Sequence, residues 1–274
     1  MTYPVHWRTE DVGAASRGAA AALLKRKVAV IYTGSTPKAS EARAVFAMEF
    51  EGFMPPEPTI AVFDLDRTVT RAGTYTPFLL STVEGGLPVA WTVLRGLAAT
   101  LTYKAGLISR SQLKARMLAL TIAGAPRVKV RGWAEAFVDR WLKTHVRPGA
   151  LAAIAKHRAA GDHLVLATAS FDFYAEIFAA RLGFDHTIAT ASVWNEADCL
   201  EAGVAGENCY GADKLAAVRG YVETRANRGR VVAYSDHHTD FDLLRWVDEG
   251  VAVNPNGKLR ARAGASGIAI VDWN

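Results

Sequence analysis

A short apolar run that ends in two aspartates constrains the fold of this chain more than any other feature. The run extends from Ile60 to Phe63, follows three prolines, and leads directly into Asp64 and Asp66. A partly β-branched run of this length is typical of a buried parallel strand rather than a helix. Side chains two residues apart in an extended chain point the same way, so both carboxylates can reach one ligand beyond the strand.

Two carboxylates this close resist double ionisation unless something cationic lies between them. A divalent metal, a lysine or a shared proton would each relieve the repulsion between Asp64 and Asp66. The alternative is an acidic loop after a strand, without any ligand.

Length and composition indicate one large domain, or a domain with an insert. The 274 residues are 50% hydrophobic and 22% charged, which is ample material for an apolar core. The net charge of +5 weakly favours anionic ligands. The basic residues are scattered and form no dense block, which argues against a nucleic-acid partner.

Cysteine content and the N-terminus point to a cytoplasmic location. Cys199 and Cys209 are too few for a disulfide framework, so we expect free thiols, with pairing on oxidation as the alternative. The first eleven residues lack the basic start and apolar stretch of a signal peptide. The longest apolar region, residues 78–103, is interrupted by Glu84 and Arg95, so we expect no stable membrane insertion.

The order of the predicted elements indicates an α/β fold. Four helical segments fill residues 75–145, and strands alternate with helices after residue 146, as in a doubly wound parallel sheet. We therefore expect a Rossmann-like core from residues 58–74 and 146–274, and an inserted helical cap at 75–145. Residues 1–57 form an N-terminal extension of unknown role, with helices predicted at 11–26 and 40–50 and a strand at 27–32.

Polar residues follow several of the predicted strands. Ser170 and Asp236 each end a strand, Lys214 opens a helix, and Asp240 lies four residues beyond Asp236. Taken singly, such a serine is usually a helix cap and such a lysine is usually solvated. Because ligands of a parallel sheet bind beyond the carboxyl ends of its strands, their joint occurrence predicts one site.

Four motifs in this order resemble those of the haloacid dehalogenase (HAD) superfamily of phosphatases. They are Asp-Leu-Asp-Arg-Thr at 64–68, Ala-Thr-Ala-Ser at 167–170, Gly-Ala-Asp-Lys at 211–214 and Ser-Asp-His-His-Thr-Asp at 235–240. The insert after the first motif and the segment Asn-Cys-Tyr-Gly at 208–211 resemble subfamily IB, the phosphoserine phosphatase-like branch. The resemblance covers about residues 58–273 and leaves 1–57 unexplained.

The resemblance implies the catalytic and metal-binding residues. Asp64 is expected to be the nucleophile that forms an aspartyl-phosphate. Asp66 is expected to protonate the leaving oxygen and then to deprotonate the attacking water. Lys214 would neutralise the nucleophile and the phosphoryl charge. Mg²⁺ would be held by Asp64, the backbone carbonyl of Asp66 and Asp236, with Asp240 orienting these ligands.

The resemblance also implies the phosphate-binding residues. Thr68 would brace the loop, and the Ser170 hydroxyl would donate to a phosphoryl oxygen. Phe171 stands where this branch often has glycine, which changes the backbone freedom beside the phosphate. His237 and His238 lie inside the fourth motif, where they contact a second metal or substrate, or face solvent as ordinary loop histidines.

Two cap positions bear on substrate choice. Gly73 stands where phosphoserine phosphatases carry a glutamate for the substrate amino group, and Arg116 aligns with the arginine that binds the substrate carboxylate. A site without that acid loses affinity for an amine, so we expect phosphoserine to be a poor substrate and Arg116 to bind an anionic group.

Taken together, the residues predict a Mg²⁺-dependent phosphomonoesterase acting on a small phosphorylated metabolite, such as an amino-alcohol or sugar phosphate. One alternative is a phosphotransferase that uses the same aspartyl-phosphate. Another is a phospho-ligand-binding regulator with little turnover. The apolar face of the helix predicted at 88–104, which carries Trp91 and Leu94, either packs within the cap or meets a lipid-like substrate or a partner.

Overall fold

The computed structural model describes residues 57–83, 87–225 and 229–274. The helices and the strand predicted within residues 1–56 lie outside this part of the chain.

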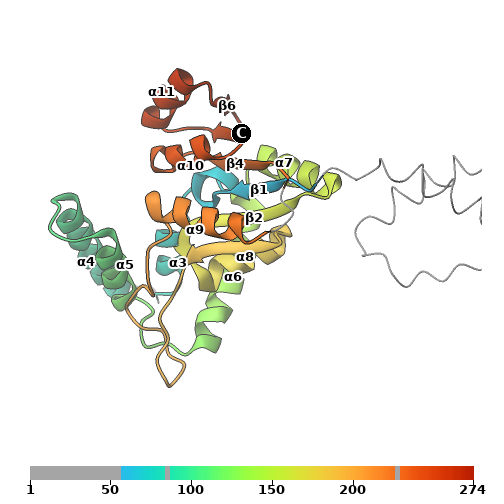
Figure 1. Cartoon of the computed structure of the whole chain (residues 1–274). Coiled ribbons are helices and arrows are strands. Elements are labelled where there is room, and N and C mark those ends of the chain that lie inside the picture. The colour runs from blue at the N-terminus through green and yellow to red at the C-terminus, as the bar shows by residue number, and fades with distance from the viewer. Residues whose placement is uncertain (1–56, 84–86, 226–228) are drawn as a thin grey trace, which may run out of the picture. The chain divides into compact units, whose positions relative to one another are not determined.

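The core is a six-stranded parallel sheet with the strand order β3-β2-β1-β4-β5-β6 (Figure 1). Its strands are β1 (Ile60–Phe63), β2 (His163–Phe171), β3 (His186–Thr190), β4 (Val231–Ser235), β5 (Glu249–Val253) and β6 (Ala269–Val271). The order reverses direction between β1 and β4, which is the switch point where ligands of such sheets bind. The predicted doubly wound α/β fold is confirmed.

Strand β1 is central because all four of its side chains are buried. It pairs in parallel with β2 on one side and with β4 on the other. Ala61 and Phe63 belong to one apolar cluster, whereas Ile60 and Val62 belong to a second cluster on the opposite face. A strand that is buried on both faces consists of consecutive apolar residues. This explains why β1 could be predicted from the sequence.

Helices cover both faces of the sheet (Figure 1). After the sheet begins, the chain forms α3 (Tyr75–Ser81), α4 (Leu87–Lys104), α5 (Arg110–Ala119), α6 (Arg127–His145), α7 (Pro148–Ala160), α8 (Asp172–Leu182), α9 (Ala212–Glu223), α10 (Phe241–Trp246) and α11 (Gly257–Ser266). Helices α7 and α8 both end at a glycine: Gly161 and Gly183 adopt φ values of 77° and 75°, the left-handed conformation that stops a helix.

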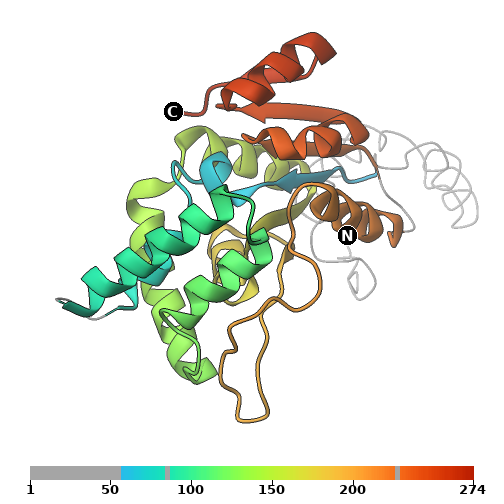
Figure 2. The same cartoon turned by 90° about the vertical axis from the view of Figure 1, so that its left-hand side faces the viewer.

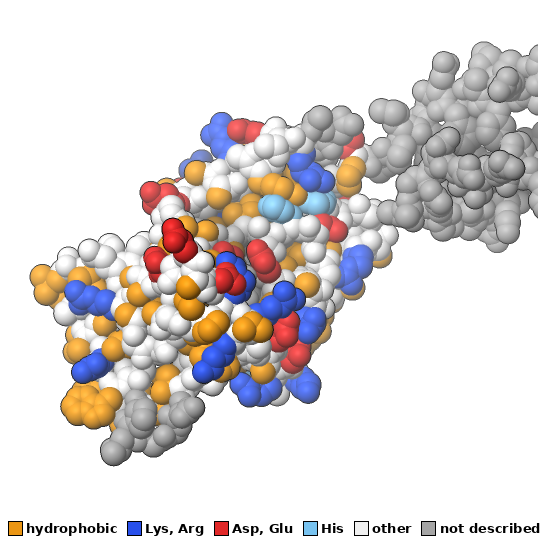
Figure 3. All heavy atoms as spheres, turned by 90° about the horizontal axis from the view of Figure 1, so that it is seen from below, with side chains coloured by type: hydrophobic (Ala, Val, Ile, Leu, Met, Phe, Trp, Pro, Cys, Tyr) orange, Lys and Arg blue, Asp and Glu red, His pale blue; other side chains and the backbone are white. Residues whose placement is uncertain are grey.

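The insert between β1 and β2 consists of α3 to α6. Helix α6 packs against α8, and its inward side chains join the core cluster. Helices α4 and α5 pack on each other and project from the sheet (Figures 1 and 2). The left-hand end of Figure 3, where these two helices lie, shows hydrophobic and basic side chains. The cap limits at residues 75 and 145 stay a prediction.

Local sequence chemistry explains where α5 begins. Ser109 accepts a hydrogen bond from Gln112 N at 3.1 Å, and the Gln112 side chain accepts one from Ser109 N at 2.8 Å. This reciprocal pair is a capping box.

One part of the chain went beyond the sequence-based expectation. Helix α11 and strand β6, which complete one edge of the sheet, were not predicted. Residues 191–205 form an excursion with short antiparallel bridges, and it contacts the chain before α6 through a bridge between Pro126 and Cys199. Cys199 and Cys209 are both free thiols, as expected.

Candidate active site

The four motifs meet at the carboxyl ends of β1 and β4, around the ammonium group of Lys214. Its Nζ donates to Asp64 Oδ1 at 2.8 Å and to Asp240 Oδ2 at 2.7 Å. All three side chains are buried. Ser235 at the end of β4 donates from Oγ to the same oxygen of Asp240 at 2.8 Å, which fixes that carboxylate. The predicted neighbours Asp64, Lys214 and Asp240 therefore form one ion-paired cluster.

A glycine places Lys214 in this cluster. Gly211 precedes α9 with φ 60° and ψ −123°, a backbone conformation that residues with a Cβ rarely adopt. The turn sends the chain into α9 so that Lys214, in the first turn, points to the ends of β1 and β4. The motif glycine is therefore a backbone requirement rather than a ligand contact.

Thr68 joins the first motif to the fourth. Its Oγ1 donates to Asp64 Oδ2 at 3.0 Å and accepts from the backbone N–H of Asp236 at 2.9 Å. It also lies 3.4 Å from Asp236 Oδ1. All three residues are buried, so the hydroxyl holds the two carboxylates on one side of the site. The predicted bracing role of Thr68 is consistent with this geometry.

Asp66 is held by residues from the cap and from β2. Its Oδ1 accepts from Thr74 N at 2.6 Å and from Thr74 Oγ1 at 2.7 Å, and its Oδ2 accepts from Ser170 Oγ at 2.9 Å. The chain turns sharply after it, with Arg67 at φ 65° in the irregular turn η1 (Leu65–Val69). Thr74 immediately precedes α3 and was missed, because a lone threonine before a helix reads as an ordinary cap.

The electrostatics of the site show a shortage of positive charge. Burial, followed by repulsion from Asp64 and Asp240, raises the pKa of Asp236 to about 7. Burial also raises the pKa of Asp64 to about 6, against the opposing effect of Lys214. For Lys214, burial lowers the pKa, but the carboxylates of Asp240 and Asp64 outweigh it and raise the pKa above the ordinary value. Lys214 pairs with Asp64 and Asp240, and its effect on the pKa of Asp236 is smaller than that of these two carboxylates.

This set of oxygens fits Mg²⁺, a hard cation that prefers oxygen ligands and keeps several waters. Within the described ranges, no three histidine, cysteine or acidic side chains converge closely enough to bind a metal by themselves. The expected Mg²⁺ site has only two side-chain ligands, Asp64 and Asp236, because its third ligand would be the backbone carbonyl of Asp66. A divalent cation would supply the charge that Asp64 and Asp236 lack.

Two predicted substrate contacts are not brought to the site. Arg116 is exposed on α5, and its Nη1 lies 3.5 Å from Thr102 Oγ1 of the neighbouring helix. Phe171 is fully buried, and its ring stacks on Phe173 at 5.4 Å, so only its backbone is left for a phosphate contact. Helical periodicity directs Arg116 outward, and the residue directed inward on the same helix is Lys114.

Lys114 is a buried residue of α5 that donates hydrogen bonds to residues beyond the insert. Its Nζ donates to the backbone oxygen of Ala169, to Thr190 Oγ1 at 3.1 Å and to Asn208 Oδ1. Burial, followed by repulsion from Arg110, lowers the pKa of Lys114 to about 7. Its signal in the sequence is its spacing of four residues from the buried Leu118, which puts a lysine on the apolar face of α5.

The histidines of the fourth motif are held by core side chains. His237 Nδ1 lies 2.8 Å from Thr239 Oγ1, and His238 Nδ1 lies 3.2 Å from Asn256 Nδ2. Burial, followed by the neighbouring His238, lowers the pKa of His237 to about 4, so its ring is neutral at pH 7.

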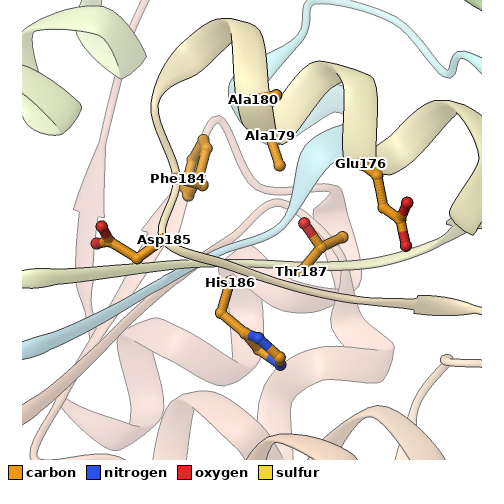
Figure 4. Close-up of a pocket in the computed structure, with 7 residues that line it drawn as sticks. All are labelled: Glu176, Ala179, Ala180, Phe184, Asp185, His186 and Thr187. Carbon is orange, nitrogen blue, oxygen red and sulfur yellow. The ribbon is translucent and has the colours of Figure 1, made fainter.

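A separate hollow of about 310 Å³ lies beside α8 and β3, and no residue of the four motifs lines it (Figure 4). Its acidic side chains, Glu176 and Asp185, lie at opposite ends and do not converge on a common point. It has none of the clustered charges found at the ends of β1 and β4.

Comparisons with known proteins agree with the site. Residues 61–245 match the model of the haloacid dehalogenase-like hydrolases. The inhibition of morphological differentiation protein of Streptomyces azureus is 32% identical and covers 79% of this chain and 79% of its own length. A protein named probable phosphatase, from Mycobacterium tuberculosis, is 28% identical, with 81% of this chain and 78% of its own covered.

Solved structures show the same fold. A protein of unknown function from Bordetella pertussis has a TM-score of 0.72 at 26% identity, over 80% of this chain and 100% of that chain. A substrate-bound phosphoserine phosphatase has a TM-score of 0.57 at 17% identity, over 81% of this chain and 96% of that chain.

A parallel sheet that carries paired aspartates beyond its central strand, next to a buried lysine, defines a Rossmann-like hydrolase. The chain belongs to the haloacid dehalogenase-like hydrolases. The predicted superfamily and an enzyme of the hydrolase type are confirmed, and the fold is shared with a phosphoserine phosphatase.

The contrast between Lys114 and Arg116 gives a testable prediction. Lys114→Met leaves buried oxygens of Ala169 and Asn208 without their ammonium donor, which costs about 1–3 kcal/mol of unfolding free energy. Arg116→Met, two residues away on the exposed side, should change it by less than about 0.5 kcal/mol. Urea denaturation at pH 7 measures both. Equal effects of the two substitutions would contradict the placement of Lys114.

Proposed function

We propose that the protein is a Mg²⁺-dependent phosphomonoesterase that hydrolyses a small phosphorylated metabolite through an aspartyl-phosphate on Asp64. The observation that carries this proposal is the environment of Asp64, a buried carboxylate at the end of β1 with Lys214 Nζ at 2.8 Å. The probable phosphatase from Mycobacterium tuberculosis and the fold shared with a substrate-bound phosphoserine phosphatase support it.

In the first step, a carboxylate oxygen of Asp64 attacks phosphorus, and the bond from phosphorus to the ester oxygen breaks. Asp66, in its protonated form, gives its proton to the leaving oxygen, and an alcohol departs. The Lys214 ammonium stabilises negative charge on the phosphoryl oxygens, because it is fixed in place by Asp240 before the reaction begins. The Ser170 hydroxyl, at the end of β2, donates to Asp66 Oδ2 before substrate binds and would exchange that acceptor for a phosphoryl oxygen.

In the second step, water replaces the alcohol. Asp66 accepts a proton from the water, whose oxygen attacks phosphorus while the bond from phosphorus to Asp64 breaks. The residue that gave a proton in the first step thus recovers one in the second. Thr74 and Ser170 hold the Asp66 carboxylate in position for both transfers, with hydrogen bonds of 2.6–2.9 Å.

Asp64, Asp236 and the backbone carbonyl of Asp66 would hold Mg²⁺, which supplies positive charge for the phosphoryl oxygens when bound. Phosphoryl transfer depends mainly on positioning and electrostatic stabilisation, which suits this cluster of fixed charges.

The substrate proposed is a small phosphorylated metabolite other than phosphoserine. Gly73 offers no charge to an ammonium group, and a side chain added there would meet open space. Phosphoserine is therefore proposed to be a poor substrate.

The free thiols of Cys199 and Cys209 support the further proposal of a cytoplasmic location. Within the described residues, no helix has the length and apolar character to cross a bilayer.

The first prediction from this mechanism concerns the nucleophile. Asp64→Asn should reduce phosphate release from p-nitrophenyl phosphate to background, because the amide cannot form an acyl phosphate. Asp242→Asn, on the exposed side of α10, is the matched control and should retain activity. A screen of phosphorylated metabolites with Mg²⁺ and with EDTA identifies the substrate. Undiminished turnover by the Asp64 variant would refute the mechanism.

The second prediction concerns proton transfer. Asp66→Asn should slow both steps by roughly 10²–10⁴-fold on an alkyl phosphate, which is the usual worth of general acid–base catalysis. With p-nitrophenyl phosphate the first step should suffer less, because that leaving group needs less protonation.

Rapid-quench measurement of phospho-enzyme formation separates the two steps. An equal loss in the first step for both esters would argue against Asp66 as the acid.

Transfer of phosphate to added glycerol in preference to water would instead identify the protein as a phosphotransferase. Binding of a phosphorylated ligand without turnover would identify it as a regulator.

The third prediction follows from the raised pKa values of Asp64 and Asp236. Because the folded state retains these protons longer than the unfolded state does, the metal-free protein should lose stability as pH rises from about 4 to about 7. Mg²⁺ binds the ionised carboxylates, so it should restore stability at pH 8 and have little effect at pH 5.

Thermal unfolding with and without Mg²⁺ measures this difference. A hundredfold excess over Kd stabilises by about 2.7 kcal/mol, or roughly 5–10 °C for a protein of this size. Asp236→Asn should abolish the rise at pH 8. The same rise at both pH values would show that these carboxylates do not bind the ion.

A further inference from the structure

Helix α4 presents large apolar side chains to solvent and small ones to the protein. Trp91, Leu94, Leu97 and Leu101 are 60%, 55%, 55% and 57% exposed. They follow one another at intervals of three or four residues and therefore lie on one side of the helix, here called the α4 outer face. The buried side carries Gly96 and Ala99, which lie against α5.

This arrangement is the reverse of an ordinary surface helix, whose apolar side faces the core. Full burial of a leucine or tryptophan side chain is worth roughly 1.5–3 kcal/mol, a stabilisation that the α4 outer face does not gain. Close packing on α5 needs only the small residues: a Cβ added at Gly96 would lie 3.3 Å from Met117 Sδ. The large side chains on the other side thus serve a contact outside the described fold.

The charge of the surrounding chain identifies the kind of partner. Residues 85–134 contain eight Lys and Arg residues and neither Asp nor Glu, whereas the net charge of the whole chain is +5. Arg95 and Lys104 are exposed on α4 itself, at the margins of the α4 outer face. In Figure 3 the end of the molecule where α4 and α5 lie shows basic side chains among hydrophobic ones, without acidic ones.

We propose that the α4 outer face docks onto a lipid bilayer with anionic headgroups, with the helix lying in the plane of the membrane surface. An exposed apolar face with tryptophan and leucine, flanked only by basic residues, is the pattern that binds at such an interface. Basic residues near an anionic surface contribute about 1 kcal/mol each. Two copies of this chain would instead bring two cationic segments together, which opposes self-association through the same face.

The docking is peripheral, which agrees with the finding that no described helix can cross a membrane. Helix α4 belongs to the insert, whereas the aspartates lie at the ends of β1 and β4, so the contact leaves the catalytic residues unchanged. The proposal therefore stands independently of the reaction catalysed.

Sedimentation with vesicles tests the proposal with the full-length protein. It should bind vesicles of 70% phosphatidylcholine and 30% phosphatidylglycerol, bind much less to pure phosphatidylcholine, and be released by 0.5 M NaCl. Leu94→Ser combined with Leu97→Ser should lower the partition coefficient at least about tenfold, because two apolar side chains leave the interface. Arg95→Glu combined with Lys104→Glu should also weaken binding, and only to the anionic vesicles.

The matched control combines Val128→Ser with Leu151→Ser, two exposed apolar residues on α6 and α7 that should leave vesicle binding unchanged. Thermal unfolding of each variant verifies the fold. Absence of binding to the anionic vesicles, or an equal loss in the control, would overturn the proposal. A dimer seen by light scattering that dissociates in the Leu94 and Leu97 variant would overturn it as well, and would assign the face to self-association.

Discussion

The buried ammonium group of Lys214 is the interaction on which the site depends. It lies between Asp64 and Asp240, and the three side chains come from a strand end, a helix start and the loop after another strand. A buried ion pair of this kind adds little net stability, because desolvation of the charges offsets their attraction. Its role is to fix positions. A buried carboxylate without its lysine would be an unpaired charge, so the ion pairs hold the ends of β1 and β4 and the start of α9 together.

The remaining charge imbalance explains why the site suits a cation and an anion together. With Asp236 added, the cluster has more carboxylates than ammonium groups, and burial makes each unpaired charge costly. Protonation relieves this at low pH, and a divalent metal would relieve it at neutral pH. In the reaction proposed above, the same preorganised charges would face a phosphoryl group, whose oxygens need positive neighbours in the transition state.

Hydrogen bonds tie the start of the insert and α5 to the core, whereas one side of α4 faces solvent. Thr74 binds the Asp66 carboxylate, and Lys114 donates to oxygens next to Ser170. These contacts tie α3 and α5 to the catalytic edge of the sheet, whereas α4 contacts α5 alone among the elements it packs against closely.

The sequence by itself determined the fold class and the motif residues, because both depend on short-range patterns. A continuous apolar run such as Ile60–Phe63 can only be a doubly buried strand here, and polar residues at strand ends must meet at one edge of a parallel sheet. The tertiary structure alone decided the contacts between segments far apart in the chain. Thr74, Lys114 and the outward turn of Arg116 depend on how the insert packs on the core, and the exposure of the α4 outer face depends on which side of a largely apolar helix finds a neighbour.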